Sequence, residues 1–484
     1  MVRTDLTEIC LQTKLLDKDM PIDEYLMQAI TPPQTSAIRR SIKLLDSLGA
    51  LDDDENLTTL GFHLADIPVD VKLSKMLIYG IIFKCIDPIL TLVSCLSIQD
   101  PFVIIHNPVD RVKCYELKQK LDEKSFSDHL VLLRIFQLWN NFKTENSYDR
   151  KFCEEHFINI GTMDRINGTR SKIIGHLRSL GIIKSNGNLT LMNTNSTKWS
   201  VIKLCLAAGL YPSIAKIDQN TGSITSEKDI KLVVHSTSSL YPGKQKLMYP
   251  TEWAIFQDKF KVGKTSIIKG CTMVTGLTIA FTAGKQLNVD DNNNCILHVD
   301  DWIRFITTEN NAHLVCEMRR LLDELMNKYL KDVHEYKFTD QDGYLIDAIA
   351  TIIQIEDGSN GFPSQLSGIG ARPRAITLKC SDYVSGNQKA TGTSEKRQMN
   401  QHEYQSHQKQ NNYVPQTVPL EQQFKKVHEV PVMNSKRFIM VKVTVALFKN
   451  IFGGRNVADA REFNFPTSFY EYILNTVSRY LLCC

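Results

Sequence analysis

The chain has 484 residues, 43% of them hydrophobic and 23% charged, which is enough for several domains with apolar cores. Its net charge of +4 excludes nucleic-acid binding through the overall field, so any such affinity has to come from local basic patches. The 12 cysteines lack zinc-binding spacing, and acidic residues such as Asp5 and Glu8 interrupt the N-terminal apolar positions. We therefore expect a cytoplasmic or nuclear protein with reduced thiols and no secretory leader.

Residues 1–70 are predicted to form a winged helix. Apolar positions recur at helical spacing from Ser36, and Gly49 marks the stop. The basic residues of this helix lie off the apolar stripe and form an outer face: Arg39, Arg40 and Lys43. An acidic turn and a strand at Leu57–Gly61 follow, which indicates helix, turn and strand. A plain helical hairpin with a polar loop is the alternative.

Residues 71–190 carry helical periodicity and are predicted to form a helical bundle. The most apolar run is Met76–Ile98, but Lys84, Asp87 and Pro88 lie at its centre. Because proline stops a helix and suits a helix start, we expect two buried helices hinged at Asp87–Pro88 and no membrane span.

Short β-rich runs broken by Gly and Pro predict a small β-barrel over residues 191–310. A helical pattern from Trp302 to Leu330 and the following stretch predict a helical extension over 311–358. Residues 359–435 are rich in polar residues with few aliphatics, so we expect a disordered linker there. The tail at 436–484 has no assigned fold.

No catalytic centre, cofactor site or metal site is predicted. The only G-K-[ST] sequence, Gly263–Thr265, has Asp258 where a phosphate-binding loop needs its first glycine, and no D-E-A-H box occurs. Asp300 and Asp301, beside Trp302, are a paired-carboxylate candidate, but a cap at the start of a helix is the favoured interpretation. ATP and Mg²⁺ would serve only a longer parent protein.

The strongest local charge is a basic strip on predicted β-segments: Lys259, Lys261, Lys264 and Lys269. Aromatic residues lie close by in sequence: Trp253, Phe256 and Phe260. Lysines and aromatics on a β-surface suit a single-stranded backbone with stacked bases, and the lysines would contact phosphates. The alternative is a solvated loop whose aromatics belong to the core.

Several blocks of this sequence resemble DEAH-box RNA helicases. These are Arg3–Leu16, Leu57–Leu77, Asp87–Thr91, Asp100–Phe102, Phe126–Leu130, Ala207–Pro212 and Val234–Ser239. The last block is similar to a His-Pro-Ser-Ser strand end of the family, with Ser236 in place of the proline. The resemblance covers roughly residues 3–310 and places the chain behind the motor domains of the family.

The resemblance implies an α+β multidomain fold of winged helix, ratchet-like helical domain and OB-like barrel. It also implies an RNA-binding accessory module that guides single-stranded RNA without an ATPase motor of its own, with His235 and Ser236 among the binding residues. Partners would be single-stranded RNA and the helicase motor domains or another protein, with no membrane. The alternative is a motor-less scaffold that binds a partner protein.

Further along, Ser367–Arg374 and, beyond a polar linker, Arg437–Met440 resemble the YTH-type helicases of animals. A YTH reader needs a tryptophan-lined cage, and no tryptophan follows Trp302. We therefore expect a fragment that lacks both the motor and a complete YTH domain.

Overall fold

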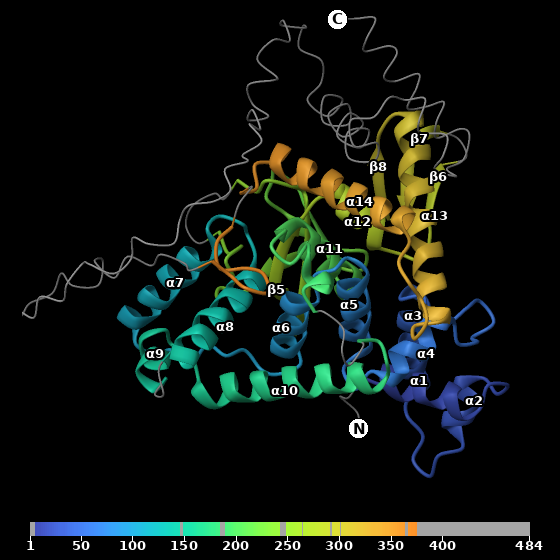
Figure 1. Cartoon of the computed structure of the whole chain (residues 1–484), viewed down its shortest axis with the longest axis horizontal. Coiled ribbons are helices and arrows are strands. Elements are labelled where there is room, and N and C mark those ends of the chain that lie inside the picture. Colours follow the sequence, from blue (N-terminus) through green and yellow to red (C-terminus); the bar gives the residue numbers. More distant parts are fainter. Residues whose placement is uncertain are drawn as a thin grey trace, which may run out of the picture. The chain divides into compact units, whose positions relative to one another are not determined.

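The computed structural model of the chain describes residues 5–145, 149–183, 189–242, 248–263, 265–290, 293–300, 302–363 and 366–374. Helices come first, a β-barrel follows, and a small sheet and long helices complete the described part (Figure 1). This is the α+β fold predicted from the sequence, with a winged-helix part, a helical bundle and an OB-like barrel.

The winged-helix part contains α1 (Thr7–Leu16), α2 (Ile22–Met27), α3 (Thr35–Ser47) and α4 (Thr59–Asp66). The apolar stripe of α3 is buried through Ile38 and Leu45. After α3 the backbone reverses at Gly49, whose φ of 74° is left-handed, as the predicted stop requires. The basic residues of α3 are exposed, which confirms the predicted outer face: Arg39, Arg40 and Lys43.

The strand predicted at Leu57–Gly61 is wrong. A single bridge pairs Leu57 with Leu51, and α4 begins two residues later. The reason lies in Thr58, whose side-chain oxygen accepts a hydrogen bond of 3.0 Å from the backbone N–H of Gly61. A threonine in this position caps a helix, so the chain turns into α4 where β-propensity favours a strand.

The helical bundle contains α5 (Val71–Ile82), α6 (Ile86–Leu96), α7 (Pro108–Asp122), α8 (Asp128–Glu145), α9 (Arg150–Glu155) and α10 (Ile160–Ser179). The run Met76–Ile98 forms two buried helices, α5 and α6, as predicted, and Pro88 lies in the first turn of α6. The short helix η1 (Leu191–Asn193) leads to α11 (Trp199–Leu210), which is buried along its whole length. Within the described residues, no helix is both long and apolar enough to cross a membrane.

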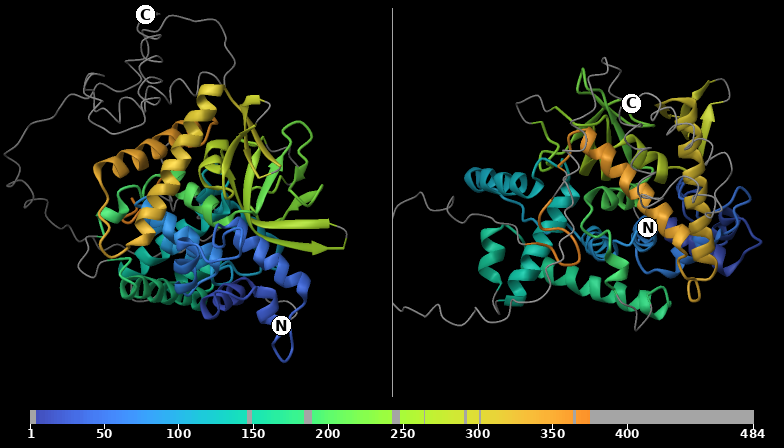
Figure 2. Two further views of the ribbon diagram at one scale, coloured as in Figure 1. Left: turned by 90° about the vertical axis from the view of Figure 1, so that its right-hand side faces the viewer. Right: turned by 45° about the horizontal axis from the view of Figure 1, so that its top comes forward.

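The barrel is built from β1 (Ile214–Ile217), β2 (Ile224–Thr225), β3 (Leu232–Val234), β4 (Trp253–Val262) and β5 (Thr265–Val274). Its strand order is β1-β2-β3-β5-β4, and β1 closes it by pairing with β4. β4 and β5 form an antiparallel hairpin that turns at Gly263 and extends beyond the other strands (Figure 2). Trp253 and Phe256 are 3% and 5% exposed, so both belong to the core, whereas Phe260 on the extension is 39% exposed.

After the barrel come α12 (Gly276–Thr282) and a three-stranded sheet of β6 (Leu287–Asp290), β7 (Asn293–Val299) and β8 (Ile303–Ile306). The helix predicted from Trp302 is therefore wrong at its start, because β8 pairs with β7 and α13 (Glu309–Lys331) begins only after it. The cap interpretation of Asp300 is wrong for the same reason, since Asp300 lies between two strands. Asp301 lies outside the described residues.

The last described helix, α14 (Asp340–Ser359), is joined to α11 by a buried ion pair of 2.7 Å between Lys203 and Asp357. Residues 366–374 then pack against α8, where the buried Arg134 donates from Nε to the carbonyl oxygen of Ser367 at 2.9 Å. This packing corrects the predicted start of the disordered linker at 359. The rest of that linker and the tail at 436–484 lie outside the described residues.

Candidate nucleic-acid interface

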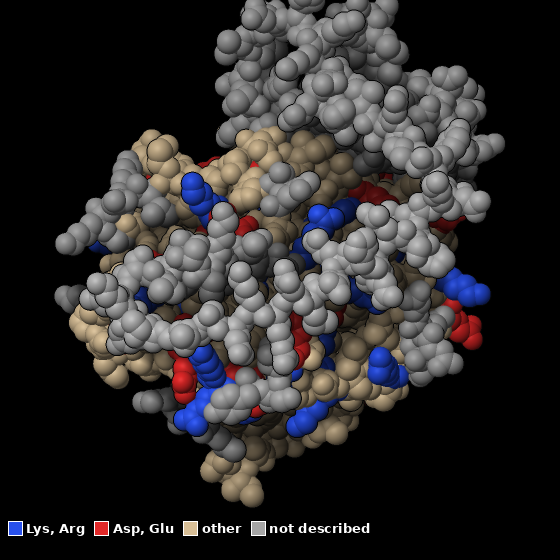
Figure 3. Space-filling model, turned by 60° about the vertical axis from the view of Figure 1, so that its left-hand side comes forward, with Lys and Arg blue, Asp and Glu red and all other residues tan. Residues whose placement is uncertain are grey.

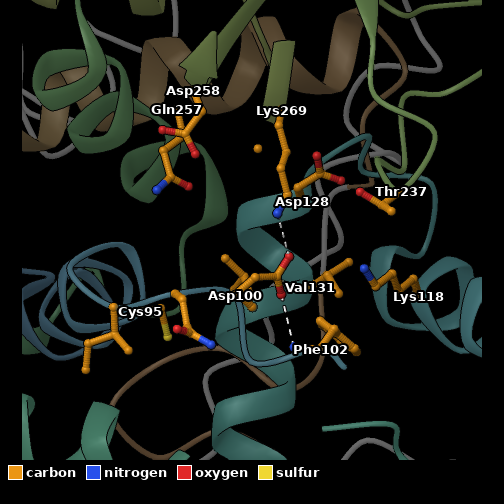
Figure 4. A pocket seen from close by; sticks show the side chains of 14 residues that line it. Cys95, Asp100, Phe102, Lys118, Asp128, Val131, Thr237, Gln257, Asp258 and Lys269 are labelled. Carbon is orange, nitrogen blue, oxygen red and sulfur yellow. Dashed lines mark hydrogen bonds and ion pairs between the residues drawn. The ribbon is translucent and has the colours of Figure 1, made fainter. Parts of the chain in front are cut away.

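A cavity of about 260 Å³ lies where the helical bundle meets the barrel. Its walls come from α6, the α6–α7 connection, α7, α8, the loop after β3, and the hairpin of β4 and β5 (Figure 4). The polar and aromatic side chains that line it are Gln99, Asp100, Phe102, Lys118, Asp128, Thr237, Gln257, Asp258 and Lys269. We refer to this cavity as the cleft.

Asp128, the first residue of α8, joins the helical bundle to the barrel at the cleft. Its carboxylate accepts hydrogen bonds from the Ser238 hydroxyl at 2.6 Å, from the backbone N–H and hydroxyl of Ser239, and from the Cys271 backbone N–H at 2.8 Å. Three of these donor groups lie in the loop after β3 and the fourth lies in β5, so one carboxylate joins α8 to two parts of the barrel. Such charge-assisted bonds are among the stronger protein hydrogen bonds.

The residues on either side of Asp128 strengthen this junction. Ser127 and His129 each hydrogen bond through Oγ and Nδ1 to the Thr272 hydroxyl, at 2.5 and 2.7 Å. His129 is fully buried, and burial lowers its pKa to about 4, so the imidazole stays neutral near pH 7. The contact between α8 and the barrel therefore consists of neutral hydroxyl and imidazole groups beside the Asp128 carboxylate, which accepts four hydrogen bonds.

Basic groups from three elements converge on the cleft. Lys269 of β5 pairs with Asp100 at 3.1 Å, and Lys118 of α7 lies 4.2 Å from the centre of the Phe102 ring. His235 is close enough to both lysines for them to lower its pKa, after the larger effect of burial. An aromatic ring beside ammonium groups is the pairing that serves base stacking and phosphate binding in single-strand binders.

Of the lysines predicted to form one basic strip, the described ones lie on two different faces of the β4–β5 hairpin. Lys269 faces the cleft, and in the hairpin it lies opposite Asp258. Lys259 and Lys261 point to the other side, because side chains alternate along a strand, and Lys259 forms an ion pair of 2.7 Å with Asp229. Lys264 lies outside the described residues.

His235 and Ser236 lie in the loop after β3, at the edge of the cleft. The turn forms although serine stands at the family's proline position, because His235 Nδ1 contacts the Thr237 hydroxyl at 2.7 Å and the His235 carbonyl accepts from Ser238. His235 also packs edge-on against Phe260, with ring centroids 5.9 Å apart. Arg39, Arg40 and Lys43 are not among the residues that line the cleft.

Sequence reasoning missed Lys118, Phe102 and Asp128 as site residues. Phe102 and Asp128 lie in blocks that carried the family resemblance, so a signal was present for both. Lys118 is one of several lysines on α7 and has no distinguishing neighbour in sequence. Its role depends on the packing of α7 against the barrel side of the bundle.

The surface around the cleft is of mixed charge. The lining of the cleft holds both lysines and aspartates, and where coloured surface is visible in Figure 3, lysine and arginine side chains are interleaved with acidic ones. Gly263 and Thr265 lie at the tip of the β4–β5 hairpin, which is not the strand-to-helix turn of a phosphate-binding loop. Among the described residues, no group of His, Cys, Asp or Glu is arranged to hold a metal ion.

Comparison with known proteins identifies three families along the chain. Residues 41–69 match "Helicase associated domain (HA2), winged-helix", residues 70–132 match "Helicase associated domain (HA2), ratchet-like", and residues 202–285 match "Oligonucleotide/oligosaccharide-binding (OB)-fold". These segments correspond to the winged-helix part, the first helices of the bundle, and the barrel with α11.

Similar curated proteins are helicases of animals and plants and one fly protein. The "ATP-dependent DNA/RNA helicase DHX36" of Bos taurus is 31% identical over 366 residues, which are 74% of this chain and 36% of that protein. "Protein benign gonial cell neoplasm" of Drosophila melanogaster is 30% identical over 394 residues, covering 74% and 32%. "DExH-box ATP-dependent RNA helicase DExH3" of Arabidopsis thaliana is 29% identical over 334 residues, covering 68% and 27%.

The chain spans about a third of the length of these relatives, 36% for the cattle helicase. The order of the matched domain families is the order of the domains in the structure: a winged helix, a ratchet-like helical domain and an OB fold. The chain therefore carries helicase-associated winged-helix and ratchet-like domains followed by an OB fold, and over 74% of its length it is similar to the cattle helicase.

Proposed function

We propose that this region binds single-stranded RNA in the cleft and guides it for a DEAH-box helicase motor, with no ATPase motor of its own. The observation that carries the proposal is that Lys118, Lys269 and Phe102 all line the cleft at the junction of the ratchet-like domain and the OB fold, with Lys118 over the Phe102 ring. OB folds bind single strands with a basic groove and stacked aromatics. The bonds of Asp128 join the two sides of this cleft.

The positive charges of Lys118 and Lys269 support contacts with the phosphates of the RNA backbone. Lys118 has no carboxylate partner in the part of the chain that the structure describes, so its ammonium group is available to a phosphate. Lys269 forms an ion pair with Asp100, and an RNA phosphate would compete with the Asp100 carboxylate for the Lys269 ammonium group. His235 and Ser236 at the edge of the cleft, and Lys261 and Lys259 on the other face of the hairpin, would extend the path.

The test is binding of a single-stranded RNA, measured by fluorescence anisotropy at low and moderate salt. We expect Lys118→Ala to weaken binding severalfold, whereas Lys151→Ala, a lysine on α9 whose side chain is 81% exposed, should leave it unchanged. The proposal is abandoned if the chain binds no RNA at low salt, or if the two variants behave alike.

A protein-interaction scaffold is the second candidate, and exposed apolar side chains favour it. Ile104, Val109 and Val112, in the α6–α7 connection and on α7, are 87%, 62% and 56% exposed. Clustered apolar residues on a surface mark a contact with another protein. The partner would be a helicase motor, and Val112→Asp should then weaken its association in sedimentation experiments while RNA binding by the chain alone stays undetectable.

We also propose that the parent protein is of the YTH type and resides in the cytoplasm, with access to the nucleus. The resemblance of Ser367–Arg374 supports the subfamily, while Arg437–Met440 lies outside the described residues. Full-length transcript sequencing tests it: motor exons upstream in the same reading frame and a YTH domain downstream support the assignment. A different downstream domain would refute it. Imaging of a tagged chain tests the location.

A further inference from the structure

The hairpin wall of the cleft carries an acidic and an amide side chain beside Lys269. Gln257 and Asp258 lie next to each other on β4, across the cleft from Phe102 and Lys118 (Figure 4). Neither side chain has a hydrogen-bond or ion-pair partner within the described ranges. They are two acceptor groups on this wall of the cleft that remain available to a ligand.

The other carboxylates of the cleft are already engaged. All the acceptor capacity of Asp128 goes to Ser238, Ser239 and Cys271. Asp100 accepts from the Phe102 backbone N–H at 3.0 Å and pairs with Lys269. Lys269 is the cross-strand neighbour of Asp258, yet its Nζ reaches Asp100 instead, which leaves the Asp258 carboxylate uncovered.

An uncovered carboxylate repels a phosphate but accepts hydrogen bonds from the amino group of a base. Carboxylates read the exocyclic amine of cytosine in this way, and single-stranded RNA presents such edges freely. The cavity of about 260 Å³ has the volume of roughly nine water molecules at about 30 Å³ each, which admits one base and no duplex. Phe102 and the Lys118 ammonium group 4.2 Å from its ring centre place an aromatic ring and a positive charge beside that base.

We infer that the cleft reads one base of the bound RNA and that Asp258, assisted by Gln257, favours bases with an exocyclic amino group over uracil. This rests on the proposed RNA binding. Lys118 and Lys269 would hold the strand whatever its sequence, and Asp258 would supply the discrimination. Asp258 is thus a specificity residue, separate from the lysines that set overall affinity.

The discriminating experiment compares oligocytidylate and oligouridylate of equal length, bound to the full chain at one salt concentration. A good base contact is worth about 1 kcal/mol or more, so the wild-type protein should prefer oligocytidylate by about fivefold or more. Asp258→Asn should bring this ratio close to one by weakening oligocytidylate binding. Asp347→Asn, an exposed aspartate on α14, is the matched control and should keep the full preference.

Asp258 is solvent-exposed and unpaired among the described residues, so Asp258→Asn is expected to fold, and its melting temperature should equal that of the wild type. Equal binding of both RNAs by the wild-type protein, or a preference that persists in Asp258→Asn, overturns the inference while leaving RNA binding intact. Absence of binding to either RNA overturns the inference and the proposed function together.

Discussion

The carboxylate of Asp128, at the start of α8, accepts a hydrogen bond of 2.7 Å from the backbone N–H of Ser239 in the barrel loop. These two residues are more than a hundred positions apart in sequence, and their contact joins the ratchet-like domain to the OB fold. The cleft lies directly at this junction. Its shape therefore depends on a contact that neither domain could form alone.

Replacing Asp128 should loosen this junction. Asp128→Ala removes hydrogen bonds from Ser238, Ser239 and Cys271, and bonds to a charged group contribute about 1.5–3 kcal/mol each. We expect the free energy of unfolding in urea to fall by about 3 kcal/mol or more, because the donors left behind are buried. Asp347→Ala, at an exposed position of α14, is the control, and a change no larger than in that control would contradict the account.

Glu356 should make stability depend on pH. Its carboxylate accepts from the Leu277 backbone N–H at 3.2 Å, and burial raises its pKa from 4.5 to about 7. Because the pKa is raised in the folded state, its contribution is fully present below pH 4.5 and is lost as pH rises through 7.

The measurement is the melting temperature of Glu356→Gln relative to the wild type across this range. The variant should gain stability relative to the wild type between about pH 5 and about pH 8, because it cannot ionise. Glu335→Gln, on an exposed residue, provides the control. A difference between Glu356→Gln and wild type that stays constant with pH would show that Glu356 titrates normally.

The backbone of Gly370 should tolerate no side chain. Its φ is +111°, and a Cβ there would lie 2.8 Å from the Thr197 side chain. Gly370→Ala should therefore lower the free energy of unfolding by about 1–3 kcal/mol and release residues 366–374 from α8. In Gly168→Ala the new Cβ meets nothing within 4 Å in the middle of α10, so stability should rise by about 0.5–1 kcal/mol.

Urea unfolding of both alanine variants, together with limited proteolysis of residues 366–374, checks this pair. If Gly370→Ala is as stable and as protease-resistant as the wild type, the packing of this segment is not what the structure shows. The comparison isolates backbone strain, because both variants introduce the same side chain.

Most of this fold could be predicted from the sequence, because most helix starts and stops are set by residues within one turn of the chain. Pro88 in a helix start and Gly49 at a helix stop act within one turn of chain, so their effects can be read without tertiary contacts. Two of the failures, at Leu57 and at Trp302, had different causes, the first local and the second a pairing between strands. A threonine cap decided the first, and pairing of β8 with β7 decided the second.

The cleft was predictable only in part. Lys269 belonged to a basic strip visible in the sequence, but alternation along β4 and β5 sent Lys259 and Lys261 to the opposite face. Lys118 and Asp258 come together across the cleft only when α7 packs beside the barrel. Long-range packing of this kind leaves no periodic signal in a single sequence.

The most direct test of the central claim is the salt dependence of single-stranded RNA binding by the wild type and by the Lys118→Ala, Lys269→Ala double variant. Each phosphate contact contributes about 0.7 to the slope of log affinity against log salt for a single strand. We predict that the double variant binds at least about tenfold more weakly at low salt and that its slope is smaller by about 1.4, two contacts' worth. An unchanged slope, with Lys151→Ala as the reference, would contradict the assignment of the cleft as the RNA path.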